Sequence, residues 1–207
     1  MKPISSNNFA GLPSCFLTAT DTDAGKTHIA GEVLKAWKNA GYSVGAFKPI
    51  ASGAIKIDDK WVSEDAQRLA EVTGQALSEI NPYTFEKPAS PHIADLKAEF
   101  DLAKCLDLYA QMYQKYDRVL VEGVGGWCVP LSEKLMLKDL ALALGLPVVM
   151  VARIGLGCIN HSLLTINQIQ YDSKLLYGWI ANCIDNDFED QKSNIEGIAT
   201  RIKLHPS

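Results

Sequence analysis

The chain lacks several features that would assign it to other classes of protein. Its 207 residues include no run of about 18 apolar residues, so no membrane span is expected. The first ten residues lack the apolar stretch of a secretory signal peptide. Charges of one sign do not cluster, and a net charge of −4 gives no electrostatic reason to expect nucleic-acid binding. We therefore expect a cytosolic protein that acts on small molecules.

Cysteine and histidine are too few and too scattered to form a disulfide framework or a metal site. The five cysteines are odd in number and include no C-x-x-C pair, which argues against both disulfides and zinc. The four histidines have no ligand-like spacing. We expect most of the cysteines to be buried thiols in a reducing compartment. The cysteines are Cys15, Cys105, Cys128, Cys158 and Cys183, and the histidines are His28, His92, His161 and His205.

What the sequence does contain is a regular alternation of apolar runs and helical patterns. Strands are predicted at 14–19, 42–50, 117–123, 147–152 and 175–182, and helices at 26–40, 63–73, 99–115, 136–144, 159–171 and 187–202. Strands that are apolar throughout and alternate with helices indicate a parallel sheet covered on both faces. We predict one domain over 1–207 with an α/β, three-layer fold and a mostly parallel sheet. The irregular stretch 75–98 is interpreted as an active-site insertion.

The sharpest motif is TATDTDAGKT at 18–27, which lies between a predicted strand and a predicted helix. A phosphate loop needs inward backbone N–H groups, a helix N-terminus, a lysine for the β- and γ-phosphates and a hydroxyl for Mg²⁺. Lys26 and Thr27 meet these needs, although Thr20 stands where the usual pattern has its first glycine. The motif predicts a P-loop for ATP and Mg²⁺. Its nucleotide-binding residues would be Thr22, Asp23, Ala24, Gly25, Lys26 and Thr27.

Further polar residues follow the predicted strands, where ligands bind in open α/β sheets. Lys48 and Ser52 follow the second strand, Glu122 ends the third and Asn182 ends the fifth. Glu122 has the position at which P-loop enzymes carry the acid that orients Mg²⁺. Asp65 lies in the first turn of a helix, where an acid favours the dipole without any function. From the residues alone, both Asp65 and Lys48 are compatible with a solvated, non-functional role.

Six segments, in order, resemble the dethiobiotin synthetase family. ATDTDAGKT (19–27) is similar to the family's GTDTxVGKT loop, and KPIASG (48–53) to its KPVASG segment. NPYTFEKPASPHIA (81–94) and VEGVGGWCVPL (121–131) resemble its NPYxFxxPxSPH and VEGAGGxxxPL stretches. GLGCINHSLLT (155–165) and GWIAN (178–182) also correspond, so the resemblance covers about residues 14–200.

The resemblance implies a reaction and a set of site residues. An ATP-dependent cyclo-ligase of biotin biosynthesis would convert 7,8-diaminopelargonic acid and CO₂ to dethiobiotin, with a carbamate and its phosphorylated anhydride as intermediates. Lys26 and Lys48 would be catalytic, and Asn182 would contact the nucleotide base. The metal ligands would be Thr27, Asp65 and Glu122. The substrate would meet Ser52, Gly125, Val129, Gly157, Cys158, Ile159 and Asn160, with the segment 157–161 supplied by the neighbouring subunit of a homodimer.

Two departures from the family pattern concern the nucleotide. Ala19 replaces the first loop glycine, and its methyl group restricts φ. The family pattern also continues beyond the last helix into a strand and a loop that help hold the base, whereas this sequence ends at 205–207. The sequence therefore assigns only Asn182 to the base.

Two other functions remain as alternatives. A partitioning-type ATPase switch of the same P-loop branch would carry an extra lysine early in the loop, where this chain has Thr20–Ala24. A GTPase switch would need D-x-x-G and N-K-x-D segments, and neither occurs. ADP release that depends strictly on the diamine would distinguish a synthetase from either switch.

Overall fold

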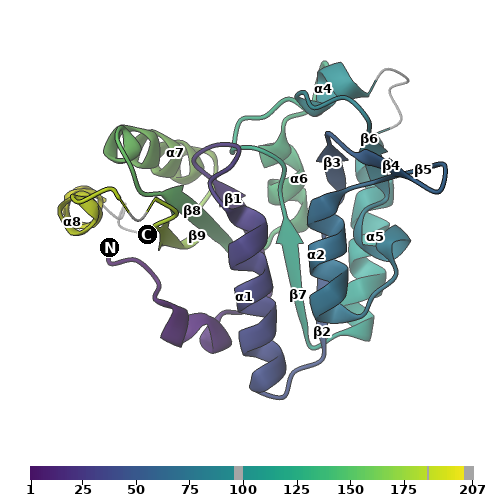
Figure 1. Cartoon of the computed structure of the whole chain (residues 1–207), viewed down its shortest axis with the longest axis horizontal. Helices are drawn as coiled ribbons and strands as arrows, with labels where there is room; N and C mark the ends of the chain where they lie inside the picture. The colour runs from purple at the N-terminus through teal and green to yellow at the C-terminus, as the bar shows by residue number, and fades with distance from the viewer. Residues whose placement is uncertain (96–99, 186, 203–207) are drawn as a thin grey trace.

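Five parallel strands form the central sheet of the computed structural model, which describes residues 1–95, 100–185 and 187–202 (Figure 1). Their order is β2-β7-β1-β8-β9, so the strand that leads into the phosphate loop is the middle one. The strands are β1 (Cys15–Ala19), β2 (Val44–Phe47), β7 (Arg118–Glu122), β8 (Val148–Arg153) and β9 (Leu176–Asn182). All four pairings are parallel, which confirms the predicted parallel sheet.

Helices cover both faces of this sheet (Figure 1). One face packs against η1 (Ser6–Gly11), α1 (Lys26–Asn39), α2 (Glu64–Thr73) and α3 (Leu77–Ile80), and the other against α5 (Leu102–Lys115), α6 (Leu137–Leu144), α7 (Cys158–Asp172) and α8 (Gln191–Arg201). Successive residues of β1 belong to the two hydrophobic cores on opposite faces of the sheet, with Phe16 in one core and Leu17 in the other. The three-layer α/β fold is thus confirmed. Within the described part of the chain, no helix combines the length and the apolar character that crossing a membrane requires.

The helix signals in the sequence act as expected. The Ser63 hydroxyl accepts a hydrogen bond from the Ala66 N–H at 3.3 Å and caps α2, and Gly74 ends this helix in the left-handed conformation. The predicted helices at 159–171 and 187–202 are α7 and α8, with ends shifted by one to four residues. Residue 99, the predicted start of α5, lies outside the described residues, and α5 begins after Asp101.

The predicted strand 42–50 is wrong as a single element. It divides into β2 and β3 (Ile50–Ser52), and β3 leaves the main sheet to pair in parallel with β6 (Tyr83–Phe85). Pro49 offers no N–H to continue the ladder. The Asn81 amide instead binds the Lys48 carbonyl at 2.8 Å, and the chain turns outward. As a result, Ser52 belongs to a separate two-stranded sheet.

The structure contains regular elements in two stretches where the sequence predicted none. The stretch between Ser52 and Ser63 forms an antiparallel hairpin of β4 (Ile55–Ile57) and β5 (Lys60–Val62), with Asp58 and Asp59 both at positive φ in its turn. The stretch read as an irregular insertion contains α3, β6 and α4 (Pro91–Ala94). Residues 96–98 of that stretch and the end of the chain at 205–207 lie outside the described residues.

Candidate active site

The phosphate loop joins β1 to α1 in the middle of the sheet. Gly25 caps α1 with φ +82°, and a Cβ built there would collide with the Asn182 side-chain amide. Only glycine fits this position. Ala19, by contrast, belongs to β1 and has no positive φ, so its methyl group does not strain the loop. The Asn182 amide also donates to the Ala24 carbonyl at 2.8 Å and fixes the loop from β9.

Lys26 is a buried cation that faces the cavity. Its Nζ donates to the Asp21 carbonyl at 3.2 Å. Burial lowers the pKa of Lys26 to about 8, although the negative charge of Glu122 acts in the opposite direction. An anion in the loop would compensate this charge, as expected for a phosphate-binding lysine.

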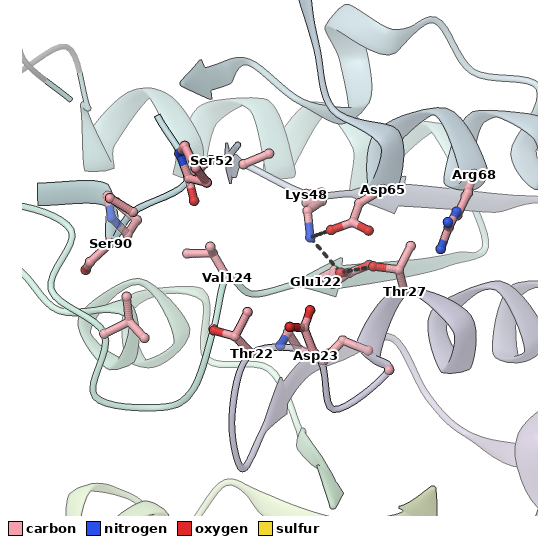
Figure 2. A pocket seen from close by; sticks show the side chains of 18 of the residues that line it. Thr22, Asp23, Thr27, Lys48, Ser52, Asp65, Arg68, Ser90, Glu122 and Val124 are labelled. Atoms are coloured by element: carbon pink, nitrogen blue, oxygen red, sulfur yellow. Dashed lines mark hydrogen bonds and ion pairs between the residues drawn. The ribbon is translucent and has the colours of Figure 1, made fainter. Parts of the chain in front are cut away.

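Lys48, Asp65, Glu122 and Thr27 form one connected group beside the loop (Figure 2). The Lys48 ammonium lies 2.6 Å from Glu122 Oε1 and 2.9 Å from Asp65 Oδ2. The Thr27 hydroxyl donates to the same Glu122 oxygen at 2.7 Å. The solvated alternative considered for Lys48 is therefore excluded, since its side chain is buried and paired with the equally buried Glu122.

The charges of this group hold each other in the ionised state. Burial alone would lower the pKa of Lys48, but Glu122 and Asp65 outweigh it and the pKa is raised. Burial likewise favours the neutral acid at Asp65, but the Lys48 ammonium overcomes this and the pKa of Asp65 is lowered. Lys48 therefore stays an ammonium at neutral pH and cannot serve as a general base.

The same group has the composition of a magnesium site. Glu122 Oε2 is buried and has no hydrogen-bond partner among the described residues, so it has a free lone pair for a cation. With the Thr27 hydroxyl and the Asp65 carboxylate it makes an all-oxygen donor set, which Mg²⁺ prefers. Within the described ranges no group of three His, Cys, Asp or Glu side chains could hold a metal ion. Phosphate oxygens and water would have to complete the coordination, as is usual for Mg²⁺ beside a nucleotide.

A cavity of about 660 Å³ extends from the phosphate loop past Lys48 to a second end (Figure 2). Ser52 of β3, Gly125 and Val129 line this cavity together with Lys26 and Thr27. Gly125 has φ +60°, and a Cβ there would lie 2.8 Å from the Val129 side chain, so only glycine leaves room. The structure thus brings residues predicted for the nucleotide and for the substrate to one cavity.

Sequence reasoning missed several residues of the wall. Arg68 was detectable in principle, because it lies three positions after Asp65 and therefore on the same side of α2. Ser90 and Pro91 belong to a segment quoted for its family resemblance, but no role was assigned to them. His28, Ala51, Pro88, Ala89 and Val124 also line the cavity.

Two predicted groups lie away from this cavity. Asn182, at the end of β9, is not among the residues that line the cavity, and its amide donates to the Ala24 carbonyl. Gly157 to Asn160, at the start of α7, are not among the residues that line the cavity of their own chain. Gly157 caps α7 with φ +86°, the Cys158 thiol bonds to Asn194, and Asn160 is exposed.

Comparisons with known proteins agree with this geometry. Residues 14–205 match the model of a family described as an AAA domain. The ATP-dependent dethiobiotin synthetase BioD of Aromatoleum aromaticum is 40% identical over 191 residues, covering 90% of this chain and 85% of the relative. The enzyme of the same name from Vibrio parahaemolyticus is 40% identical over 197 residues, covering 92% and 86%. The chain belongs to the dethiobiotin synthetase family. Its ATP dependence and its P-loop follow from that membership, and it is an enzyme of the ligase class.

The similarity to solved structures concerns the fold alone. A ParA family ATPase of Chlorobium tepidum has a TM-score of 0.52 at 15% identity, covering 92% of this chain and 82% of that one. A chain of the MinC:MinD cell division complex of Aquifex aeolicus has a TM-score of 0.52 at 15% identity, covering 91% and 78%. The dethiobiotin synthetases are far more similar in sequence, so the alternative of a partitioning switch is not favoured.

Proposed function

We propose that this dethiobiotin synthetase closes the ureido ring of dethiobiotin from 7,8-diaminopelargonic acid, CO₂ and ATP, with Mg²⁺, in the cytosol. The observation that carries the proposal is the position of Lys48. Its ammonium lies between Asp65 and Glu122 in a cavity that runs from the phosphate loop to the end formed by Ser52, Gly125 and Val129. A fixed positive charge there can contact a carbamate and a transferring phosphoryl group at once.

The nucleotide would bind with its phosphates on the loop from Thr22 to Thr27. The Lys26 ammonium and the N–H groups at the start of α1 are the donors for the β- and γ-phosphates. Mg²⁺, when bound by Thr27, Asp65 and Glu122, would neutralise charge on the phosphate oxygens. Asn182 lies beside the loop at the end of β9, where we place the base.

The chemistry would proceed by three bond-forming steps. The neutral amine adds to CO₂ and loses a proton to solvent, giving a carbamate. A carbamate oxygen then attacks the γ-phosphorus, and ADP leaves. The second amine attacks the carbonyl carbon of the mixed anhydride, phosphate leaves and the ring closes. Because Lys48 remains protonated, its contribution is electrostatic stabilisation of the two anionic stages.

The substrate carboxylate would be bound by a second subunit of a homodimer. Gly157 to Asn160 form a helix start that does not line the cavity of their own chain. Leu156, just before α7, and Leu164 and Tyr171 on α7 are large apolar side chains that are all strongly exposed. A partner covering this surface would remove them from water and bring an anion-binding helix start to the other active site.

The direct test is ADP release by the purified protein with ATP, Mg²⁺ and bicarbonate, with and without the diamine. We expect release only with the diamine, together with incorporation of labelled bicarbonate into a cyclic urea. A substrate that lacks one of the two amines is the matched control, because it can form a carbamate but cannot close the ring. ADP release at the same rate without any diamine would contradict the proposal and favour a switch.

A further inference from the structure

Asp172, the last residue of α7, joins three parts of the structure through one enclosed carboxylate. Its Oδ1 accepts from the Lys138 ammonium at 2.8 Å, and its Oδ2 accepts from the Trp127 indole at 2.8 Å and the Gln168 amide at 3.0 Å. The carboxylate side chain is only 7% exposed. Burial would raise the pKa of Asp172, but the three donors lower it, so the carboxylate is charged.

Of these three donors, only Trp127 belongs to the glycine-rich loop 123–129, which follows β7 and lines the cavity. The backbone of this loop is held at Gly123, which donates to Leu17 at 3.0 Å, and at Val129, which accepts from Leu137 at 2.8 Å. Among the residues that the structure describes, no backbone hydrogen bond involves 124–128. The bond from Trp127 to Asp172 is therefore the polar anchor of the loop's central part.

The position of this loop determines the shape of the substrate end of the cavity. Gly125 and Val129, on either side of Trp127, both line the cavity, and their closest approach leaves no room for a Cβ at Gly125. On its other side the loop touches the end of β1, since a Cβ at Gly126 would lie 3.4 Å from the Ala19 carbonyl. A small shift of Trp127 would therefore change the space offered to a substrate.

We propose that Asp172 is a positioning residue for the diamine, acting through Trp127 to hold Gly125 and Val129 in place. The identity of the occupant rests on the proposed function, whereas the anchor itself rests on the contacts of Asp172. Lys138 and Gln168 donate to the same carboxylate but belong to α6 and α7 and not to the loop. Replacing either of them therefore tests whether an effect comes from the loop or from the carboxylate in general.

The test compares four variants in one assay with the diamine as the varied substrate. Trp127→Phe keeps the buried ring and removes the N–H, and Asp172→Ala removes the acceptor. Each should raise the KM for the diamine about tenfold, the loss expected for one hydrogen bond to a charged group, while the Kd for Mg-ADP changes less than about twofold. The double variant should be no worse than either single one. Asp172→Asn, whose amide oxygen can still accept from Trp127, should recover most of the affinity.

Lys138→Met is the matched control, since it removes a donor to Asp172 that belongs to α6 and leaves the Trp127 hydrogen bond in place. It should leave the diamine KM within about twofold of the wild type. An unchanged KM in Trp127→Phe, or an equal rise in Lys138→Met, would overturn the positioning role. If Asp172→Ala does not fold, Trp127→Phe and Asp172→Asn still decide the question. A wild type without diamine-dependent turnover would instead contradict the proposed function, and this is measured first.

Discussion

The ammonium of Lys48 lies 2.6 Å from Oε1 of Glu122, and both side chains are almost completely enclosed. Glu122 ends β7 and Lys48 follows β2, the strand next to it in the sheet. Because parallel strands end at the same edge, neighbouring strands bring these two charges together without any long loop. Breaking such a pair leaves an uncompensated buried charge, which is costly for the fold as well as for catalysis.

Lys48→Gln should therefore reduce both turnover and stability. We expect kcat to fall by roughly 10²–10³, because a preorganised charge at the transferring phosphoryl group is lost. The Kd for Mg-ADP should change less than about tenfold, since Lys26 and the loop remain. Titration calorimetry with Mg-ADP beside steady-state kinetics measures both. A loss of ADP affinity as large as the loss of turnover would place Lys48 in the nucleotide site instead.

The stability of Lys48→Gln should also depend on pH. At pH 7 the free energy of unfolding should fall by about 3–5 kcal/mol, because the Glu122 carboxylate is left buried without its partner. In the wild type, despite the opposing effect of burial, Lys48 lowers the pKa of Asp65 below its ordinary value of 3.8. The stability that this ion pair contributes is therefore fully present above pH 3.8. It is lost as the pH falls through the pKa that Asp65 has in the folded protein. The difference between variant and wild type should accordingly narrow below about pH 4 in urea titrations. Lys115→Gln, at an exposed pair with Glu79, should leave the free energy of unfolding nearly unchanged over the same pH range.

Replacing Lys26 should have opposite effects on activity and stability. Lys26→Met should lower kcat by roughly 10²–10³. It should also stabilise the nucleotide-free protein by about 1–3 kcal/mol at pH 7, because a buried, weakly paired charge is removed. Lys35→Met, on the exposed side of the same helix, should change neither quantity appreciably. Retention of more than about a tenth of the activity in Lys26→Met would contradict the phosphate-binding role.

The stabilisation by Lys26→Met should disappear at high pH. Below pH 8 the wild-type lysine is charged in both the folded and the unfolded state, so its burial cost is fully present. Between about 8 and 10.5 the folded protein releases this proton while the unfolded chain still holds it, and the wild type gains stability relative to the variant. For the same reason, binding of ADP above pH 8 should be accompanied by proton uptake, which calorimetry in buffers of different ionisation enthalpy detects.

A Cβ at Gly25 should damage the phosphate loop. Gly25→Ala places an L-residue at φ +82° and drives its methyl group into the Asn182 amide, so the loop must shift. We expect Mg-ADP affinity to fall by at least about tenfold, with about 1–2 kcal/mol lost in stability. Gly31→Ala is the matched control, because it lies inside α1 with nothing within 4 Å of an added Cβ. That substitution should stabilise the protein by up to about 1 kcal/mol. Unchanged nucleotide affinity in Gly25→Ala would mean that the loop rearranges on binding.

Shared active sites should be detectable by mixing inactive subunits. Lys26→Ala disables the phosphate loop, and Asn160→Trp blocks the start of α7. A hybrid dimer has one site with neither defect, so random subunit exchange should restore up to about a quarter of the wild-type activity in a twofold-symmetric dimer. Adding Leu164→Glu to both chains places a charge on the exposed surface of α7 and should prevent the restoration. No recovery after confirmed exchange would show that each chain works alone.

The sequence predicted the central sheet and the phosphate loop because both depend on local patterns. Five apolar runs, the G-K-T after the first of them and the cap of α2 need no long-range information to be recognised. The division of the predicted strand 42–50 into β2 and β3 was missed, because it depends on Asn81, about thirty residues away, which binds the carbonyl of Lys48. The hairpin β4–β5 was missed for another reason: its strands are almost entirely exposed and its turn contains Asp58 and Asp59 without a glycine.

The site residues also divide into those that local sequence patterns indicate and those that depend on long-range contacts. Lys26, Thr27 and Glu122 are recognisable from motif and strand position. Asp65 and Lys48 remained open on the residues alone, and became assignable once a resemblance pointed to them. The ion pair between Lys48 and Asp65 depends on the tertiary fold, because one residue follows β2 and the other belongs to α2. The role of Asp172 could not be predicted from the sequence. Its hydrogen-bond donors Trp127 and Lys138 are distant in sequence and come close only in the folded chain.

The hairpin β4–β5 forms a two-stranded sheet separate from the central one. It joins Ser52 to Asp65, at the ends proposed for the substrate and the metal. Among the described strands β4 and β5 pair only with each other, and the turn at Asp58 and Asp59 is exposed. Exposed polar turns of this kind accept inserted segments and new chain ends. The hairpin is thus the natural point at which to open the chain for circular permutation, or to insert a binding peptide whose occupancy would be coupled to the enzyme from both ends of its cavity.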